Sequence, residues 1–219
     1  MRLLSVPGVH RPRSDTWLLR DAILRERLPG ASVADLCTGS GALAVAAALA
    51  GAGNVLAVDV SLRSMLAARL NARLNGCELR VRRGDLIAAL GEERFDVIVS
   101  NPPYVPAATD ALPLHRSTTP LDGGRDGRAL IDRVCGEAPA RLRPGGALLL
   151  VHSSVCGVER TCEKFEGRGL GVAIVARRRG PLGPVLRSRA ALLRRRGLLG
   201  ERDEEELVVI RAAAPGTSA

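Results

Sequence analysis

The sequence predicts an α/β fold whose sheet is mainly parallel and doubly wound. Seven short apolar runs of strand length alternate with segments of helical periodicity. A glycine-containing turn follows the first run and leads into an alanine-rich helix, as in nucleotide-binding α/β units. With 219 residues, 46% of them hydrophobic, the chain can bury the core of one such domain. We therefore expect a single domain over 1–219, with a helical extension over 1–30 and the sheet-containing core over 31–219.

The first half of the chain is expected to contain three helices and four strands. Ser14 or Asp15 is the expected N-cap of the first helix, and Pro29-Gly30 ends it. Its apolar residues available for burial are Trp17, Leu18, Ile23 and Leu24. The third helix has four leucines on one face, Leu62, Leu66, Leu70 and Leu74. The helices are expected at 14–28, 42–50 and 61–75, and the strands at 32–36, 55–58, 79–81 and 95–100.

The second half of the chain continues the alternation. A proline-rich segment that extends to about residue 121 is expected to be a loop near the ligand site. The elements expected after it are helices at 128–142 and 158–168 and strands at 147–152, 172–177 and 206–211, with a basic connector before the last strand. The final two strands are expected to form an antiparallel edge of the sheet.

Composition excludes several classes of protein. The five cysteines form no CxxC pair, so neither a disulfide framework nor a metal site is expected, and a reducing cytoplasm is the expected location. No apolar run approaches the roughly 18 residues that span a bilayer, and we expect no membrane association.

The formal charge of +9 and the pI near 10.7 favour an anionic partner such as RNA or a ribosome-associated protein. Almost every basic residue is arginine, however, with Lys164 as the lone lysine, which indicates a coding bias. The runs at 177–179 and 194–196 are interpreted as solvated charge, with contact to the ribosome or to an acidic protein as the alternative. Aromatic residues, at 2%, are too scarce for a platform that stacks several bases.

A cofactor site is predicted where the first three strands end. The segment Asp35–Gly41 follows the first strand and opens a helix, so its glycines allow a ligand to approach the backbone. Asp59 ends the second strand, where a carboxylate accepts hydrogen bonds from both ribose hydroxyls. Asp85 ends the third, where it accepts an adenine amino hydrogen. The alternative is that these acids are helix caps or solvated turn residues.

A nicotinamide-binding fold also matches part of this pattern. Residues 39–44 fit GxGxxA, and an acidic residue follows about 18 residues later. The chain offers no Ser/Tyr/Lys or His/Asp set for hydride transfer, and it contains Asn101-Pro102-Pro103-Tyr104 at the end of the fourth strand. The asparagine carbonyl and the following main-chain carbonyl can accept both hydrogens of a planar NH2 group, while Tyr104 stacks on it. This motif favours methylation of an amide or an exocyclic amine.

With these residues assembled, the chain resembles the HemK family of S-adenosylmethionine-dependent methyltransferases, which modify the glutamine amide of class I release factors at N5. The similarity extends over nearly the whole chain. The segment Arg11–Leu19 is similar to the N-terminal motif of the short branch found in eukaryotes and archaea, which lacks the extra N-terminal helical domain of the bacterial enzymes. About 30 residues precede the first expected strand, in agreement with that branch.

The resemblance implies a class I methyltransferase, Rossmann-like fold with a mainly parallel seven-stranded sheet, and S-adenosyl-L-methionine as cofactor. It implies a class I release factor as protein substrate and a small activator subunit as a further partner. The implied catalytic residues are Asn101, Pro102, Pro103 and Tyr104. The implied cofactor-binding residues are Asp15, Thr16, Asp35, Thr38, Gly39, Gly41, Asp59, Asp85, Leu86 and Asn101.

Two segments bear on how closely the family pattern is followed. Cys37 replaces the first glycine of the acidic-x-Gly-x-Gly-x-Gly pattern, and because cysteine does not easily adopt a positive φ, we expect an ordinary or mildly altered turn there. Pro120–Arg128 is similar to the Gly-Gly-x-x-Gly segment of the family, with an ordinary helix-capping turn as the alternative. The loop Val105–Thr119, with Asp110, His115 and Arg116, identifies no partner.

Several functions remain open from the sequence. The leading prediction is a protein glutamine methyltransferase in which Asn101 and Pro102 orient the substrate nitrogen toward the sulfonium methyl group, without a strong base. The alternatives are a methyltransferase for an exocyclic amine of ribosomal RNA or DNA, one for a small-molecule amine, and an inactive cofactor-binding scaffold. The isolated His10, His115 and His152 are interpreted as structural or exposed residues.

Overall fold

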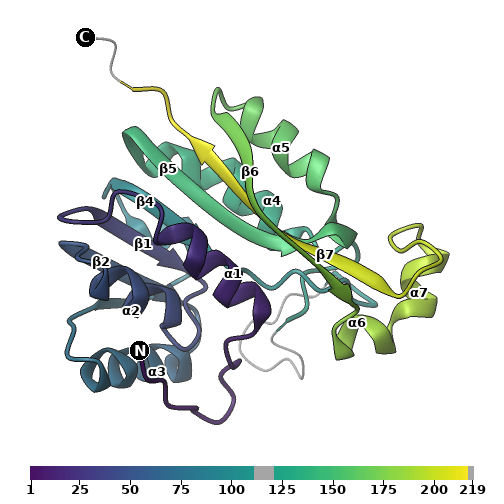
Figure 1. Cartoon of the computed structure of the whole chain (residues 1–219), viewed down its shortest axis with the longest axis horizontal. Helices are drawn as coiled ribbons and strands as arrows, with labels where there is room; N and C mark the ends of the chain where they lie inside the picture. Colours follow the sequence, from purple (N-terminus) through teal and green to yellow (C-terminus); the bar gives the residue numbers. More distant parts are fainter. Residues whose placement is uncertain (111–120, 217–219) are drawn as a thin grey trace.

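The computed structural model describes residues 1–110 and 121–216. Its seven strands form one sheet in the order β3-β2-β1-β4-β5-β7-β6 (Figure 1). The five strands from β3 to β5 run parallel, whereas β7 is antiparallel to both β5 and β6. The predicted α/β class, with a mainly parallel sheet and an antiparallel edge, is confirmed.

The elements follow one another as the periodicity predicts, with a few additions. The strands are β1 (Ser32–Leu36), β2 (Asn54–Asp59), β3 (Arg80–Arg83), β4 (Phe95–Ser100), β5 (Leu142–Ser153), β6 (Gly171–Pro181) and β7 (Glu204–Ala213). The α-helices are α1 (Ser14–Ile23), α2 (Ala42–Leu49), α3 (Leu62–Leu74), α4 (Ala129–Glu137), α5 (Val158–Glu166), α6 (Pro184–Ser188) and α7 (Ala190–Arg195). Three short 3-10 helices complete the set, η1 (Leu86–Leu90), η2 (Ala138–Arg141) and η3 (Ser154–Cys156). None of the helices in the described part of the chain is long and apolar enough to cross a membrane.

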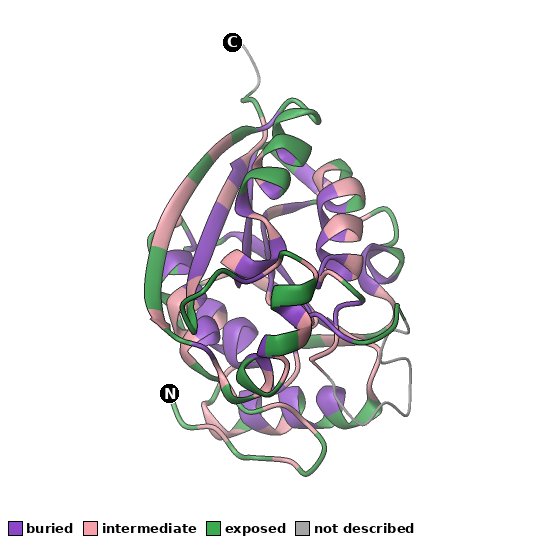
Figure 2. Cartoon of the chain, turned by 90° about the vertical axis from the view of Figure 1, so that its right-hand side faces the viewer, coloured by how far each residue is buried: buried purple, intermediate pink, exposed green. Residues whose placement is uncertain are grey.

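Helices cover both faces of the sheet, and each face has its own apolar cluster. Alternate residues of β4 point to opposite sides: Ile98 joins the cluster under α4 and α5, whereas Val97 and Val99 join the cluster under α1 and α2. Figure 2 shows that the central strands are buried, in contrast to β6 at the antiparallel edge, which is exposed or intermediate along its length.

Helix α1 is shorter than the sequence predicts and begins differently. It ends at Ile23, so that Leu24 is left 49% exposed. The N-cap is Arg13, which makes no side-chain capping bond, and the prediction that Ser14 or Asp15 caps the helix is wrong. Asp15 instead lies in the first turn of the helix and is buried. Its carboxylate accepts hydrogen bonds from Thr16 and Tyr104.

Two segments of the C-terminal half differ from the expected pattern. The helix expected over 128–142 is divided: α4 ends at Glu137, and Pro139, which has no N–H group to donate to the preceding turn, lies in the separate turn η2. The basic connector between β6 and β7 contains the short helices α6 and α7, whose Leu186 and Leu193 are buried. Isolated helices of this length are marginal, so tertiary packing rather than helix propensity stabilises them.

Helix α3 presents its first two leucines outward, while Leu70 and Leu74 are half-buried. Leu62 and Leu66 are 63% and 53% exposed, while Met65, Ala68 and Ala72 of the same helix are buried. The small alanines allow close approach to α2: a Cβ on Gly41 would lie 2.7 Å from the Cα of Ala68. Close helix packing therefore selects the alanine face, and the larger Leu62 and Leu66 are left on the outside.

The turn after β1 corrects a further expectation. Cys37 has φ of 60°, in the left-handed region, so the prediction of an ordinary turn there is wrong. The Thr38 N–H donates to the Val58 carbonyl at 3.0 Å and the Gly41 N–H to the Thr38 carbonyl at 2.8 Å, so the surrounding bonds fix the backbone path. A left-handed conformation costs a residue with a Cβ roughly 1–2 kcal/mol, which the fold accommodates at this position.

The outward orientation of the first two leucines on α3 can be tested by unfolding two neighbouring variants in denaturant. Met65→Ala should lower the free energy of unfolding by about 2–5 kcal/mol, because it empties a buried position. Leu66→Ala should change it by less than about 0.5 kcal/mol, because that side chain lies mostly in solvent. Equal losses in the two variants would contradict the observed packing.

The strained backbone at Cys37 makes a second prediction about stability. Cys37→Gly and Cys37→Ala both remove the thiol, but only the glycine variant relieves the positive φ. Cys37→Gly should therefore be more stable than Cys37→Ala by about 0.5–1 kcal/mol in denaturant unfolding, although glycine is normally the less stable of the two. A more stable alanine variant would show that the turn relaxes to a negative φ.

Candidate active site

A cavity of about 1290 Å³ lies at the carboxyl ends of β1, β2 and β4. This is the edge at which open α/β sheets bind ligands, because loops from several parallel strands converge there. Its walls are formed by residues 8–16, the turn after β1, the ends of β2 and β4, and the start of the β6–β7 connection. Most of the predicted site residues line this cavity, and Asp35 and Gly41 do not.

Asp35 supports the turn that follows β1. It is fully buried, and its Oδ2 accepts hydrogen bonds from the Thr38 hydroxyl and the Ala44 N–H. Burial raises the pKa of Asp35 to about 7, and its Oδ1 has no partner among the described residues. In the structure this carboxyl group holds the turn against the start of α2.

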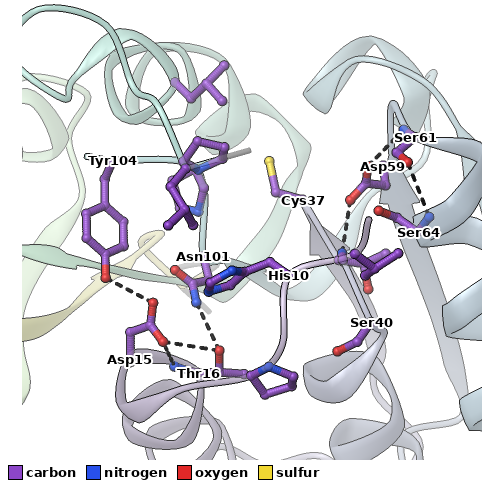
Figure 3. Close-up of a pocket in the computed structure, with 18 of the residues that line it drawn as sticks. His10, Asp15, Thr16, Cys37, Ser40, Asp59, Ser61, Ser64, Asn101 and Tyr104 are labelled. Carbon is purple, nitrogen blue, oxygen red and sulfur yellow. Dashed lines mark hydrogen bonds between the residues drawn. The ribbon is translucent and has the colours of Figure 1, made fainter. Parts of the chain in front are cut away.

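Asp59, at the end of β2, presents its carboxylate to the cavity. Its Oδ2 accepts the Gly39 N–H and its Oδ1 the Ser61 N–H, both at 2.9 Å (Figure 3). Burial raises the pKa of this carboxyl group, while the two N–H donors act in the opposite direction. Each carboxylate oxygen has a further lone pair, so the group can accept hydrogen bonds from two adjacent hydroxyls.

Asp85 does not end the third strand, as the sequence predicts, but lies just after it. β3 ends at Arg83, and Asp85 follows it as the N-cap of η1 instead of ending the strand. Asp85 and Leu86 both line the cavity, and Leu86 has a positive φ of 47°. Arg133 of α4 donates to Asp85 at 3.0 Å, a partner that sequence spacing does not reveal because α4 is 48 residues away.

Asn101 is held by the first turn of α1. Its Nδ2 donates to the Thr16 hydroxyl at 3.2 Å, and the Thr16 N–H donates to Asp15 at 2.7 Å (Figure 3). The amide nitrogen is therefore engaged on the protein side, which leaves the Asn101 carbonyl oxygen as the group that can accept a hydrogen bond from a ligand.

Tyr104 is hydrogen-bonded to the carboxylate of Asp15. Its hydroxyl donates to Asp15 Oδ2 at 2.9 Å, as Figure 3 shows. Burial, together with the negative charge of Asp15, raises the pKa of Tyr104 well above its usual value, so the phenol stays protonated. Asp15 thus connects α1 to both ends of the Asn-Pro-Pro-Tyr motif.

The glycine-rich segment after the motif packs directly on it. The Gly123 N–H donates to the Val105 carbonyl at 2.9 Å. A Cβ on Gly123 would lie 2.7 Å from the Pro103 carbonyl oxygen, and one on Gly127 would lie 2.3 Å from that of Tyr104. These glycines are therefore required for close contact with the motif. Pro120, His115 and Arg116 lie outside the described residues.

The described histidines and Cys37 are poor candidates for acid–base or nucleophilic chemistry. His152 is fully buried beside Thr161, and burial lowers its pKa to about 4. His10 lines the cavity, and burial lowers its pKa as well. Burial raises the pKa of the Cys37 thiol well above its usual value, so it is not a thiolate near neutral pH.

Solved structures with the same fold include methyltransferases. The chain aligns with Mtq2 in the E. cuniculi Mtq2-Trm112 complex at a TM-score of 0.65 and 24% identity, covering 94% of this chain and 98% of that one. It aligns with a 16S rRNA N2 methyltransferase of T. thermophilus, in complex with AdoMet and guanosine, at a TM-score of 0.57 and 25% identity, covering 95% of this chain and 45% of that one.

Proteins that match this chain in sequence have names that specify the group that is methylated. The family model of the methyltransferase small domain matches residues 14–116. A Methanocaldococcus jannaschii protein named as a protein N5-glutamine methyltransferase is 32% identical over 175 residues, which are 80% of this chain and 87% of that protein. A release factor glutamine methyltransferase of Geobacter sulfurreducens is 40% identical over 66% of this chain and 53% of its own length.

A ribosomal protein uL3 glutamine methyltransferase of Bordetella pertussis is 42% identical over 64% of this chain and 50% of its own length. The chain thus spans most of the archaeal relative and about half the length of these two bacterial ones. A match that covers 80% of this chain and 87% of the archaeal relative, with the Asn-Pro-Pro-Tyr motif at the cavity, decides the assignment: the chain belongs to the HemK family of S-adenosylmethionine-dependent protein glutamine methyltransferases.

Proposed function

We propose that this chain methylates the side-chain amide of a glutamine in a translation release factor. The observation that carries the proposal is the orientation of Asn101, whose amide nitrogen is bound to Thr16 so that its carbonyl oxygen is left for the substrate. The names of several relatives, which specify release factors, support this choice of substrate.

The cavity suits S-adenosylmethionine on the side of β1 and β2. Around Gly39 the nearest atom to a hypothetical Cβ is the Cys37 carbonyl oxygen at 3.9 Å, so a ligand can approach the backbone closely. Asp59 lines the cavity and is held by two N–H donors, one on each oxygen, and each oxygen keeps a further lone pair for a hydroxyl of a ribose diol. We propose that Thr38, Gly39 and Asp59 hold the methionine and ribose parts, while Asp85 and Leu86 lie by the adenine.

In the proposed mechanism, Asn101 and the Pro102 carbonyl accept the two hydrogens of the substrate NH2 group. This arrangement orients the nitrogen lone pair, which amide resonance otherwise makes a weak nucleophile. S-adenosylmethionine supplies an electrophilic methyl group. Thr16 fixes the Asn101 amide in one orientation, and Tyr104 packs beside the acceptor. The substrate N–H becomes acidic only as positive charge develops on nitrogen, so its proton can leave to water without a strong base.

The aromatic content favours an amide acceptor over a nucleobase. Of the Phe, Tyr and Trp side chains, Tyr104 is the one that lines the cavity and can contact an acceptor there. Phe95 and Phe165 are fully buried, and Trp17 lies against the Arg20 guanidinium at 5.0 Å. Enzymes that act on a flipped base stack it between aromatic or apolar side chains, and here Tyr104 supplies the one aromatic surface. Ribosomal protein uL3, RNA and a small-molecule amine remain the alternative acceptors that the experiment below distinguishes.

The N-terminal extension and a further subunit belong to the same proposal. Asp15 and Thr16 come from α1 and line the cavity, so we propose that residues 1–30 and the sheet act as one methyltransferase domain.

The edge strand β3 and the exposed Leu62 and Leu66 of α3 form a surface suited to a small activator subunit. The chain of the Mtq2-Trm112 complex that aligns with this protein has the same fold and is bound to a second subunit.

The proposed acceptor is tested by mass spectrometry of a full-length release factor from the same source, after incubation with the chain and S-adenosylmethionine. One methyl group should appear on the glutamine of the Gly-Gly-Gln loop, and it should be absent with Asn101→Ala. Addition of a candidate activator subunit controls for a missing partner. Methylation of uL3 or ribosomal RNA in place of the release factor would overturn the proposal.

The separate roles of the two halves of the cavity make a kinetic prediction. Asn101→Ala should reduce kcat about 100-fold or more with little change in S-adenosylmethionine affinity, because it removes an interaction with the reacting nitrogen. Asp59→Ala should weaken cofactor binding about tenfold or more, because two hydroxyls lose their acceptor. Calorimetry of cofactor binding and steady-state kinetics separate these effects, and equal affinity losses in the two variants would refute the assignment.

A further inference from the structure

The connection between β6 and β7, residues 182–203, forms one wall of the cavity. Gly183, Pro184, Val185 and Leu186 line it at the start of α6. The Gly183 N–H donates to Glu205 Oε1 at 2.9 Å, which fixes the beginning of the connection to β7. Figure 1 shows α6 and α7 between the end of β6 and the start of β7.

Two stretches of backbone lie between this wall and the Asn-Pro-Pro-Tyr motif. We call residues 105–108 and 121–125 the two arms. They run side by side: the Val105 N–H donates to the Leu121 carbonyl at 2.9 Å, and the Ala107 N–H donates to the Gly124 carbonyl at 2.8 Å. The first arm continues directly from Tyr104, so a displacement of this arm would also displace the end of the motif.

Arg189 links the connection to both arms. Its Nη1 donates to the Pro106 carbonyl at 2.9 Å on one arm and to Asp122 Oδ1 at 2.7 Å on the other. The side chains of Arg189 and Asp122 are only 21% and 19% exposed, so the ion pair is partly shielded from solvent. Such a pair contributes more than an exposed one, because water and salt screen it less.

Arg196, which follows α7, makes a second link between the same arms. Its Nη1 donates to the Ala107 carbonyl at 2.6 Å and to the Arg125 carbonyl at 2.7 Å. Its Nη2 donates to the Ala108 carbonyl at 3.2 Å. The planar guanidinium carries five N–H donors in a fixed fork and can satisfy three carbonyls at once, whereas a glutamine amide has only two N–H donors.

The neighbouring arginines provide a contrast. Arg194 donates to the Gly200 and Glu201 carbonyls and to Asp203, all within the connection itself. Arg195 is exposed, and within the described residues no hydrogen bond or ion pair is recorded for it. The run at 194–196, interpreted from the sequence as solvated charge, therefore contains one residue with a specific structural task and one that serves as its matched control.

We propose that Arg189 and Arg196 are positioning residues that determine acceptor affinity by holding both arms against the wall formed by Gly183–Leu186. The inference rests on the proposed function and specifies which residues shape its acceptor side. Within residues 1–110 and 121–216, the hydrogen bonds of both guanidinium groups go to the arms, and none goes to Thr38, Gly39 or Asp59 on the cofactor side. Their loss therefore alters acceptor binding and leaves cofactor binding intact.

The kinetic test compares Arg196→Gln with Arg195→Gln, using the full chain, S-adenosylmethionine and the release factor. Arg196→Gln should raise KM for the release factor about tenfold or more, because charged hydrogen bonds to the arms are lost. Its dissociation constant for S-adenosylmethionine should stay within about twofold of the wild-type value. Arg195→Gln should leave both constants unchanged. An unchanged KM in Arg196→Gln, or an equal loss of cofactor affinity, would overturn the proposal.

Hydrogen exchange of the unliganded chain supplies a readout that does not need turnover. Arg196→Gln and Arg189→Gln should accelerate exchange of the Val105, Ala107 and Gly123 amides, while amides in β1 and β2 keep their wild-type rates. Unchanged exchange in the arms would refute the positioning role. A wild-type chain that leaves the release factor unmethylated would refute the proposed acceptor separately, and the exchange rates would still decide whether these arginines hold the arms.

Discussion

The active site depends on one buried carboxylate, that of Asp15. It accepts the Tyr104 hydroxyl and the Thr16 N–H, and Thr16 in turn accepts the Asn101 amide. A helix before the sheet is thereby joined to both ends of a motif that lies almost 90 residues later. Without this link, the Asn101 amide would be free to rotate, and its carbonyl would have no fixed direction. The N-terminal extension therefore contributes residues to the cavity and holds two members of the motif in place.

The cofactor side of the cavity is organised by the backbone of the turn after β1. Asp35 is buried under this turn and accepts hydrogen bonds from Thr38 and Ala44. Asp59 accepts the Gly39 N–H of the same turn. The turn has a positive φ at Cys37, a conformation that a glycine at this position of the family pattern adopts without strain. Two carboxylates with raised pKa values thus flank one short turn, one of them buried under the turn and the other lining the cavity.

The excess of arginine has a partly internal explanation. Arg128 is almost fully buried and donates to the Cys156 and Gly157 carbonyls. Arg189 and Arg196 likewise donate to main-chain carbonyls near the cavity. A guanidinium can satisfy several carbonyls in loops that have no regular pairing of their own. The net charge of +9 therefore overstates how much of the basic surface is available to an anionic partner.

The sequence by itself determined the order of elements, the parallel sheet and the location of the cavity. Periodicity of two or about 3.6 residues is a local property, and acidic residues at the ends of parallel strands must meet at one edge. Only the tertiary structure decided which face of α3 is buried, because close packing against α2 favours Ala68 over the larger Leu66. It also decided that Asp15 binds Tyr104 instead of capping α1, and that Arg196 bridges two arms. These contacts join residues 70 to 90 positions apart, and no local pattern encodes a partner at such a distance.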